Sequence, residues 1–345
     1  GDYFTNFNQD PELGEIPEKI KQLVPENVQL VYWDYFSREQ QRYEKNIDAH
    51  NAIKSESWFA GGLWTWAGFA PHNAFAIATM REAMRACRAK GVENVVMTMW
   101  GDNGAECSKF AVLPALFMVA QMARGIDDEE TIHANFEKEF GIPFEDFRAL
   151  DLAGTQNDSA EAIYNPEKYL LYCDPFMGQF DNRVKPADAA GYANCAARLA
   201  VYADHAEYGY LFRSLRALCA FLSVKADLGI RTRAAYLSGD KKAAKALCTD
   251  YDAAVERLDV FYAAYEQQWM HENKPQGFDV VDLRIGGQRQ RLLHCRDRLL
   301  AYAEGRLDRI EELEEPVLDC CCEEKADGQA TRAIFWHEIA SANVI

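Results

Sequence analysis

The first 125 residues alternate short β-rich runs with amphipathic helical stretches, a pattern that predicts βα units around a parallel sheet. Three units can be counted, with strands expected at residues 27–33, 57–63 and 94–99. Helices are expected after them at residues 37–53, 73–90 and 108–123, the first one capped by Ser37. Strand ends roughly thirty residues apart are typical of a (β/α)8 barrel, but a small open α/β sheet would show the same period.

The rest of the chain changes character twice. Residues 126–184 mix prolines with aromatic segments, which predicts a connector packed against the sheet domain. Residues 185–345 are rich in Ala, Leu, Arg and Glu, with helical periodicity over 187–237, 241–270 and 281–302. Breaks in this periodicity are expected at Gly239, Gly277, Gly286 and Gly287. The predicted fold class is therefore α/β plus all-α, with an α-helical C-terminal domain.

Charge and cysteine usage limit the partners and the compartment. The net charge of −17 argues against a nucleic-acid or membrane partner, since both would repel an acidic surface. The ten cysteines lack the spacing of a disulfide scaffold, which favours reduced thiols and a cytoplasmic location. Three consecutive cysteines, Cys320, Cys321 and Cys322, cannot readily converge on one zinc ion, so no metal or other cofactor is expected. The chain begins with Gly1, and we expect its natural start to lie upstream.

Functional groups of a parallel barrel lie where its strands end, and the first two strand ends here are unusual. At the first, Tyr32 and Asp34 are two residues apart, so on an extended chain they project to the same side and could hold a polar ligand. A core tyrosine followed by a helix-capping aspartate is the alternative. At the second, a glycine pair precedes Trp64 and Trp66, whose indoles could stack on the apolar face of a sugar. Aromatic core packing is the alternative there.

The third strand end combines an aromatic side chain with carboxylates. Trp100 is followed by Asp102 and Glu106 in a glycine-rich loop. Ionised carboxylates are acceptors that suit sugar hydroxyls. A calcium loop is the competing interpretation, but the segment lacks the spaced ligands of an EF-hand. The three strand ends together predict a carbohydrate site.

This succession of motifs resembles the last three strand ends of glycoside hydrolase family 20, and most closely bacterial β-N-acetylhexosaminidases with a helical C-terminal domain. The matching motifs are Tyr32-x-Asp34, Gly62-x-Trp64-x-Trp66 and Trp100-Gly101-Asp102-Asn103-Gly104-x-Glu106-Cys107-Ser108. The resemblance covers residues 1–125, and extends more loosely to 171–175 and 273–280. It implies that residues 1–125 are the C-terminal part of a (β/α)8 TIM barrel, namely its last three βα units.

The resemblance also implies a mechanism and roles for particular residues. In that family the acetamido group of the substrate attacks C1 to form an oxazoline, while a glutamic acid protonates the leaving oxygen. Tyr32 would be the catalytic residue that hydrogen-bonds the acetamide carbonyl, and Asp34 would bind a distal hydroxyl. The pocket would be walled by three tryptophans, Trp64, Trp66 and Trp100.

The last strand end departs from the family pattern, which is often Trp-x-Glu. Here Asp102 occupies the matching position and Glu106 follows four residues later, so either could bind the O4 and O6 hydroxyls. The preference between N-acetylglucosamine and N-acetylgalactosamine therefore stays open.

The general acid of the family is missing from this sequence. It belongs to an adjacent Asp-Glu pair in a His-x-Gly-x-Asp-Glu type motif on an earlier strand, and no such motif occurs here. The chain is thus expected to be an inactive fragment of an exo-acting enzyme for N-acetylhexosamine-containing glycans, with a homodimer through the helical domain as a further expectation. The alternative is a non-catalytic carbohydrate-binding or scaffold module.

Overall fold

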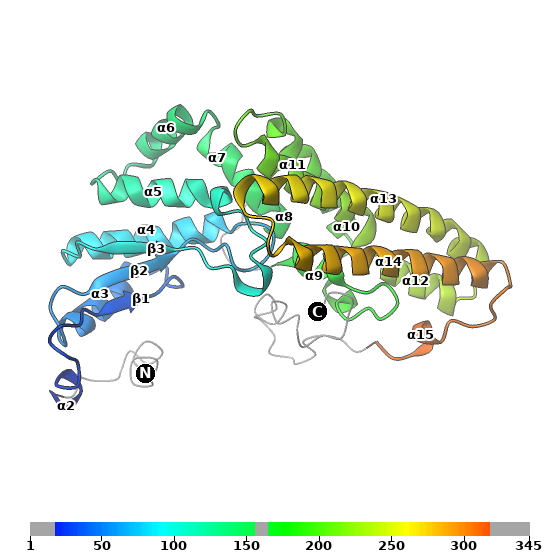
Figure 1. The fold of residues 1–345 in the computed structure, drawn as a ribbon, viewed down its shortest axis with the longest axis horizontal. Helices are drawn as coiled ribbons and strands as arrows, with labels where there is room; N and C mark the ends of the chain where they lie inside the picture. The colour runs from blue at the N-terminus through cyan, green and yellow to red at the C-terminus, as the bar shows by residue number, and fades with distance from the viewer. Residues whose placement is uncertain (1–17, 156–164, 318–345) are drawn as a thin grey trace. The chain divides into compact units, whose positions relative to one another are not determined.

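The computed structural model describes residues 18–155 and 165–317, which fall into two units (Figure 1). The first unit lies within Gly1–Trp64, His72–Trp100 and Val112–Phe147. The second lies within Thr65–Pro71, Gly101–Ala111 and Arg148–Ile345. The second unit thus includes the two loops that follow the second and third strands of the first.

The first unit is built on a parallel sheet of three strands in the order β1-β2-β3, as the sequence predicts. They are β1 (Val31–Trp33), β2 (Trp58–Gly62) and β3 (Val95–Thr98). Each is shorter than its predicted range. A closed barrel is not seen among the described residues, so the barrel remains a proposal.

Each strand is followed by a helix: α3 (Gln40–Asn51), α4 (Asn73–Ala89) and α5 (Leu113–Ala123). Ser37 does not cap α3, because the helix begins three residues later and Ser37 Oγ accepts a hydrogen bond from Glu39 N at 3.2 Å outside it. The third predicted helix is divided, since a 3₁₀ turn at Lys109–Val112 precedes α5. The remaining helices of the first unit are α2 (Glu18–Lys21), α6 (Glu129–Phe140) and α7 (Phe144–Phe147).

Helices α3 and α4 cover one face of the sheet. The rings of Tyr32 and Phe59 contact Tyr43 of α3, and a Cβ on Gly61 would lie 2.3 Å from Met80 Sδ of α4. Side chains alternate along a strand, so the neighbours of these residues point to the other face. That second face carries four exposed apolar side chains in the described structure, Val31, Trp33, Val96 and Trp100. It is called the open face below.

The second unit is helical. Its long helices α11 (Gly209–Lys225), α13 (Lys241–Glu272) and α14 (Phe278–Ala303) pack in succession, and α13 and α14 run side by side in Figure 1. The shorter helices are α8 (Leu152–Thr155), α9 (Pro166–Tyr172), α10 (Asp188–Leu199), α12 (Leu228–Leu237) and α15 (Glu311–Glu314). Short 3₁₀ turns occur at Asp102–Gly104, Arg148–Asp151, Asp181–Arg183 and Ala200–Tyr202. The predicted helical C-terminal domain is therefore confirmed.

Two of the four predicted glycine breaks are correct. Both have positive φ: Gly239 lies between α12 and α13, and Gly277 directly precedes α14. Gly286 and Gly287 lie inside α14, so the break predicted there is wrong. A helix tolerates an interior glycine at a cost of about 1 kcal/mol, which the packing of α14 against α13 offsets.

The cysteines of the described ranges that are identified as free are all buried. Cys320, Cys321 and Cys322 lie outside the described residues. Within those ranges no helix is both long and apolar enough to cross a membrane.

Candidate functional site

Tyr32 lies on the helix-covered face of the sheet and is fully buried. Its ring centroid is 5.1 Å from that of His50 on α3, and its hydroxyl donates a hydrogen bond to Asp34 Oδ2 at 2.8 Å. Burial, reinforced by the Asp34 carboxylate, raises the pKa of Tyr32 and keeps the hydroxyl protonated. The Tyr32 side chain therefore packs under α3, and the ligand contact predicted for it stays a prediction.

Asp34 closes the turn after β1. Its backbone N–H donates to Ala60 O at 3.2 Å, continuing the strand pairing by one residue. Its Oδ1 accepts the backbone N–H of Phe36 at 2.9 Å, the local bond that aspartate commonly makes in turns. The carboxylate is partly exposed, so a role in binding a ligand hydroxyl stays open for Asp34.

Trp33 points to the open face, opposite to Tyr32. Its side chain stacks on that of Trp100, with ring centroids 5.5 Å apart and 27° between the planes. The two residues are 47% and 41% exposed. β2 lies between their strands, and its residues on this face nearest the pair are the small Ala60 and Gly62, which leaves room for the indoles to meet. The result is an exposed aromatic pair at the carboxyl ends of two parallel strands.

Trp64 belongs to a buried aromatic cluster of the first unit. Its Nε1 donates to Tyr35 O at 3.1 Å, and its ring meets Phe36 and Phe75 edge to face. Alternation along an extended chain predicts Trp64 and Trp66 on one side. That alternation does not apply, because β2 ends at Gly62 and Trp64 adopts a left-handed φ of 52°. Trp66 is also buried, and it belongs to the second unit.

The loop over residues 101–111 separates the two predicted carboxylates. Asp102 begins a 3₁₀ turn and is exposed, whereas Glu106 is buried. Glu106 Oε2 accepts from Lys168 Nζ at 2.9 Å, and Oε1 accepts from Arg284 Nη1 at 3.3 Å. Both oxygens of Glu106 are therefore engaged inside the second unit, whereas Asp102 is exposed to solvent.

The loop over residues 65–71 is held by a buried amide and a buried carboxyl. Asn165 Nδ2 donates to Ala67 O at 2.9 Å, and Glu167 Oε1 accepts from Phe69 N at 3.0 Å and Ala70 N at 3.3 Å. Burial raises the pKa of Glu167 to about 7, against the opposing effect of these backbone hydrogen bonds. The Glu167 carboxyl group can therefore be protonated near neutral pH.

The comparison with protein families decides the membership of this chain. Residues 143–332, more than half of the sequence, match the family described as Glycoside Hydrolase 20C C-terminal domain. The chain belongs to this glycoside hydrolase family. A search among curated proteins finds no match. The resemblance to glycoside hydrolase family 20 is thereby confirmed, although the match covers the helical region and begins after the strand-end motifs.

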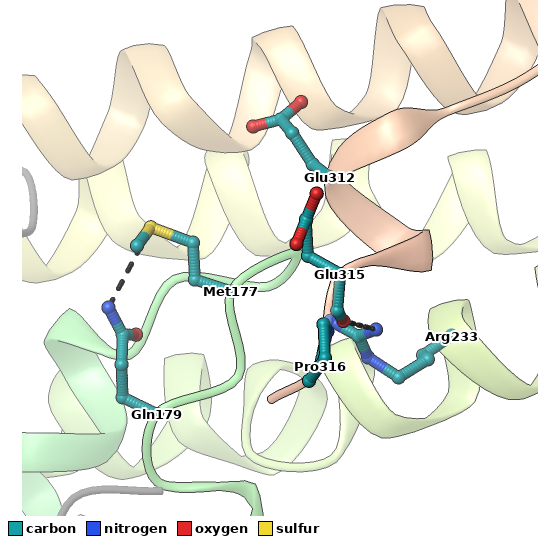
Figure 2. A pocket seen from close by; sticks show the side chains of 6 residues that line it. All are labelled: Met177, Gln179, Arg233, Glu312, Glu315 and Pro316. Atoms are coloured by element: carbon teal, nitrogen blue, oxygen red, sulfur yellow. Dashed lines mark hydrogen bonds between the residues drawn. The ribbon is translucent and has the colours of Figure 1, made fainter. Parts of the chain in front are cut away.

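The glycoside hydrolase domain contains a cavity of about 610 Å³. It is lined by six residues, Met177, Gln179, Arg233, Glu312, Glu315 and Pro316, and Figure 2 shows them around it. The guanidinium of Arg233 donates to the carbonyl oxygens of Leu313 and Glu315. None of the site residues predicted from the sequence is among these lining residues.

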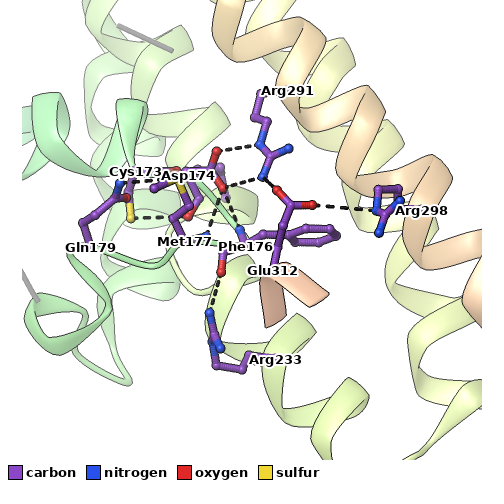
Figure 3. A network of polar contacts seen from close by, with 10 residues as sticks. Cys173, Asp174, Phe176, Met177, Gln179, Arg233, Arg291, Arg298 and Glu312 are labelled. Carbon is purple, nitrogen blue, oxygen red and sulfur yellow. Dashed lines mark hydrogen bonds and ion pairs between the residues drawn. The ribbon is translucent and has the colours of Figure 1, made fainter. Parts of the chain in front are cut away.

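A polar network lies beside this cavity (Figure 3). Arg291 binds Asp174 through Nε at 2.6 Å and Glu312 through Nη2 at 2.5 Å. Asp174 Oδ1 also accepts from Phe176 N at 2.8 Å. Because Glu312 lies in α15, these contacts fasten that short helix to α14 within the glycoside hydrolase domain.

Several residues of the site were not identified from the sequence. Trp33 lies in a predicted strand next to Tyr32, and alternation shows that the two face opposite ways without showing which way is covered. No sequence motif predicts the contacts of Asn165, Glu167 and Lys168. Their partners are 62 or more residues away along the chain, so no local spacing reveals the contacts.

Proposed function

We propose that this glycoside hydrolase chain forms the sugar-holding side of a retaining, exo-acting β-N-acetylhexosaminidase. The observation that supports this most is the exposed pair of Trp33 and Trp100, which stands at the carboxyl ends of β1 and β3. Active sites of parallel barrels lie at those ends. The proposal thus adds Trp33 to the aromatic walls of the pocket, beside Trp100.

The sheet fits the last three βα units of a TIM barrel. Its covered face packs on α3 and α4, as in the outer layer of a barrel. Its open face exposes large apolar side chains, which normally marks a surface that something else covers. Further strands of the same protein, closing the barrel on that face, would bury Val31 and Val96.

The proposed chemistry is substrate-assisted. The acetamido oxygen attacks C1, the bond to the leaving oxygen breaks, and a glutamic acid outside this chain donates the proton. The Trp33 and Trp100 indoles would pack on the apolar faces of the ring and acetamide, holding the nucleophile in its attack geometry. Asp102 would accept hydrogen bonds from distal hydroxyls, with Asp34 as a second acceptor. No cofactor takes part in this mechanism.

The test compares two aryl glycosides in the full-length protein. An aryl β-N-acetylglucosaminide or β-N-acetylgalactosaminide should be hydrolysed, whereas the matching aryl β-glucoside, which lacks the acetamide, should not. The 345-residue chain alone should bind N-acetylglucosamine but should not hydrolyse either aryl N-acetylhexosaminide. Sugar binding with no hydrolysis by the full-length protein would instead establish a carbohydrate-binding module. Full turnover by the chain alone would refute the proposal that the general acid lies outside this chain.

The remaining expectations are part of the same proposal. They are terminal N-acetylhexosamines of glycans as ligands, a cytoplasmic location, domain limits near residues 125 and 185, and a homodimer through the helical domain. Solution scattering of the full-length protein tests the dimer, and a monomer at every concentration would rule it out.

A further inference from the structure

One short segment of the second unit contacts both of the loops that follow β2 and β3. Asn165 and Glu167 bind the 65–71 loop, and Lys168 binds Glu106 of the 101–111 loop. These residues stand at the start of α9, whose proline at the first position suits a helix beginning there. Two loops that are far apart in sequence are therefore joined through four consecutive positions of the chain.

The contacts to the 65–71 loop leave little freedom. Asn165 and Glu167 have no exposed surface, so the backbone groups that they bind could not easily exchange them for water. Gly68 is required at the closest approach, because a Cβ there would lie 2.2 Å from Glu167 Oε1. The loop is held by two side chains acting on its backbone, one accepting from amides and the other donating to a carbonyl.

The contact to the 101–111 loop is a buried ion pair. The side chains of Lys168 and Glu106 are 1% and 3% exposed, and Arg284 is a second cationic partner of the Glu106 carboxylate. Removing charges from water is costly unless they are well paired, so this geometry resists displacement. Tyr265 adds a hydrogen bond from its hydroxyl to Glu106 O at 3.0 Å. A Cβ on Gly104 would lie 2.7 Å from Glu106 Oε1, so the loop closes tightly over the pair.

We propose that Asn165, Glu167 and Lys168 form a clamp of positioning residues that fixes the 65–71 and 101–111 loops relative to each other. This inference rests on the proposed function, because the 101–111 loop carries Asp102, the proposed acceptor of sugar hydroxyls. None of the three clamp residues needs to touch the substrate. Displacement of a binding group by about 1 Å can reduce a rate by about two orders of magnitude, so the clamp would control catalysis through geometry.

The test uses the full-length protein with paired variants. Glu167→Gln keeps the Oε1 acceptor, whereas Glu167→Ala removes it and leaves two amides without their partner. Lys225→Met is the matched control, because this second buried lysine binds the carbonyls of Leu170 and Cys173 at the other end of α9 and contacts neither loop. Amide hydrogen exchange of Phe69 and Ala70 is measured together with kcat and KM on an aryl β-N-acetylhexosaminide.

The expected result separates the clamp from general stability. Glu167→Ala should raise exchange at Phe69 and Ala70 at least tenfold and lower kcat/KM about 10- to 100-fold. Glu167→Gln should restore both to within about threefold. Lys225→Met should lower the melting temperature but leave exchange at the two amides unchanged. Equal effects of Glu167→Ala and Lys225→Met on exchange and on kcat/KM would overturn the clamp.

Failure of the proposed function would be recognised separately. If the unaltered full-length protein hydrolyses no aryl glycoside, the enzyme assignment fails, and the positioning of catalytic loops fails with it. The exchange data still report on the holding of the loop in that case, since they need no substrate.

Discussion

Trp33 and Trp100 stack on the open face of the sheet although they lie 67 positions apart in the sequence. Their strands do not pair with each other, because β2 lies between them. Ala60 and Gly62, the residues of β2 nearest the pair on this face, are small and leave room for the contact. The aromatic pair is therefore a product of all three strands.

Replacing Trp33 should affect catalysis more than replacing its neighbour. In the full-length protein Trp33→Ala should lower kcat/KM on an aryl β-N-acetylhexosaminide by about 10- to 100-fold, because one wall of the pocket is lost. Tyr32→Phe, which removes only a hydroxyl under α3, should keep activity within about threefold and cost about 1 kcal/mol of stability. Steady-state kinetics decide this, and the reverse order would return the ligand contact to Tyr32.

The buried ion pair of Lys168 and Glu106 should be strongly coupled. Lys168→Met leaves Glu106 with Arg284 as its remaining cationic partner and should reduce the free energy of unfolding by about 3 kcal/mol. Glu106→Gln should cost less in this variant than in the unaltered protein, because the ion pair with Lys168 is already lost. Urea denaturation of the four proteins in this double-mutant cycle gives the coupling energy, and simple additivity would contradict the prediction.

Glu167 should make stability depend on pH. Its pKa is about 7 in the folded protein against 4.5 for an unperturbed glutamate, so the folded state holds a proton that the unfolded state releases between these values. Stability is then full below pH 4.5 and falls as pH rises toward 7, by at most about 1.4 kcal/mol per pH unit. Urea midpoints at pH 5, 6 and 7 measure it. Glu167→Gln should weaken the pH dependence of stability. An unchanged pH dependence in this variant would show that Glu167 is not its cause.

Two glycines of the second unit should respond oppositely to alanine. Gly286 lies inside α14 with open space around its Cβ position, so Gly286→Ala should stabilise the protein by about 0.5–1 kcal/mol. Gly277 has φ 97° before the same helix, where a side chain is strained, so Gly277→Ala should destabilise it. Thermal unfolding of both variants distinguishes them. A loss of stability in Gly286→Ala would show a steric restriction that the structure does not contain.

Local patterns in the sequence determined the element types. Alternating β-rich and amphipathic runs gave three parallel strands with their helices, and the Ala- and Leu-rich region gave the helical domain that the family match confirms. Gly239 and Gly277 marked true helix limits because a positive φ is a property of the local backbone. Motif resemblance reached the correct family for the same reason, since strand-end motifs are short and contiguous.

Only the tertiary structure decided which strand residues are covered by helices and which carboxylates form buried ion pairs. Tyr32 and Trp33 are equally plausible in a three-residue strand, and the packing of α3 buries one and leaves the other exposed. Asp102 and Glu106 are both acidic in the same loop, and Lys168 and Arg284 engage one of them. Periodicity fixes the spacing of side chains along a strand or helix. The face that is covered, and the charge that is paired, depend on segments distant in the sequence.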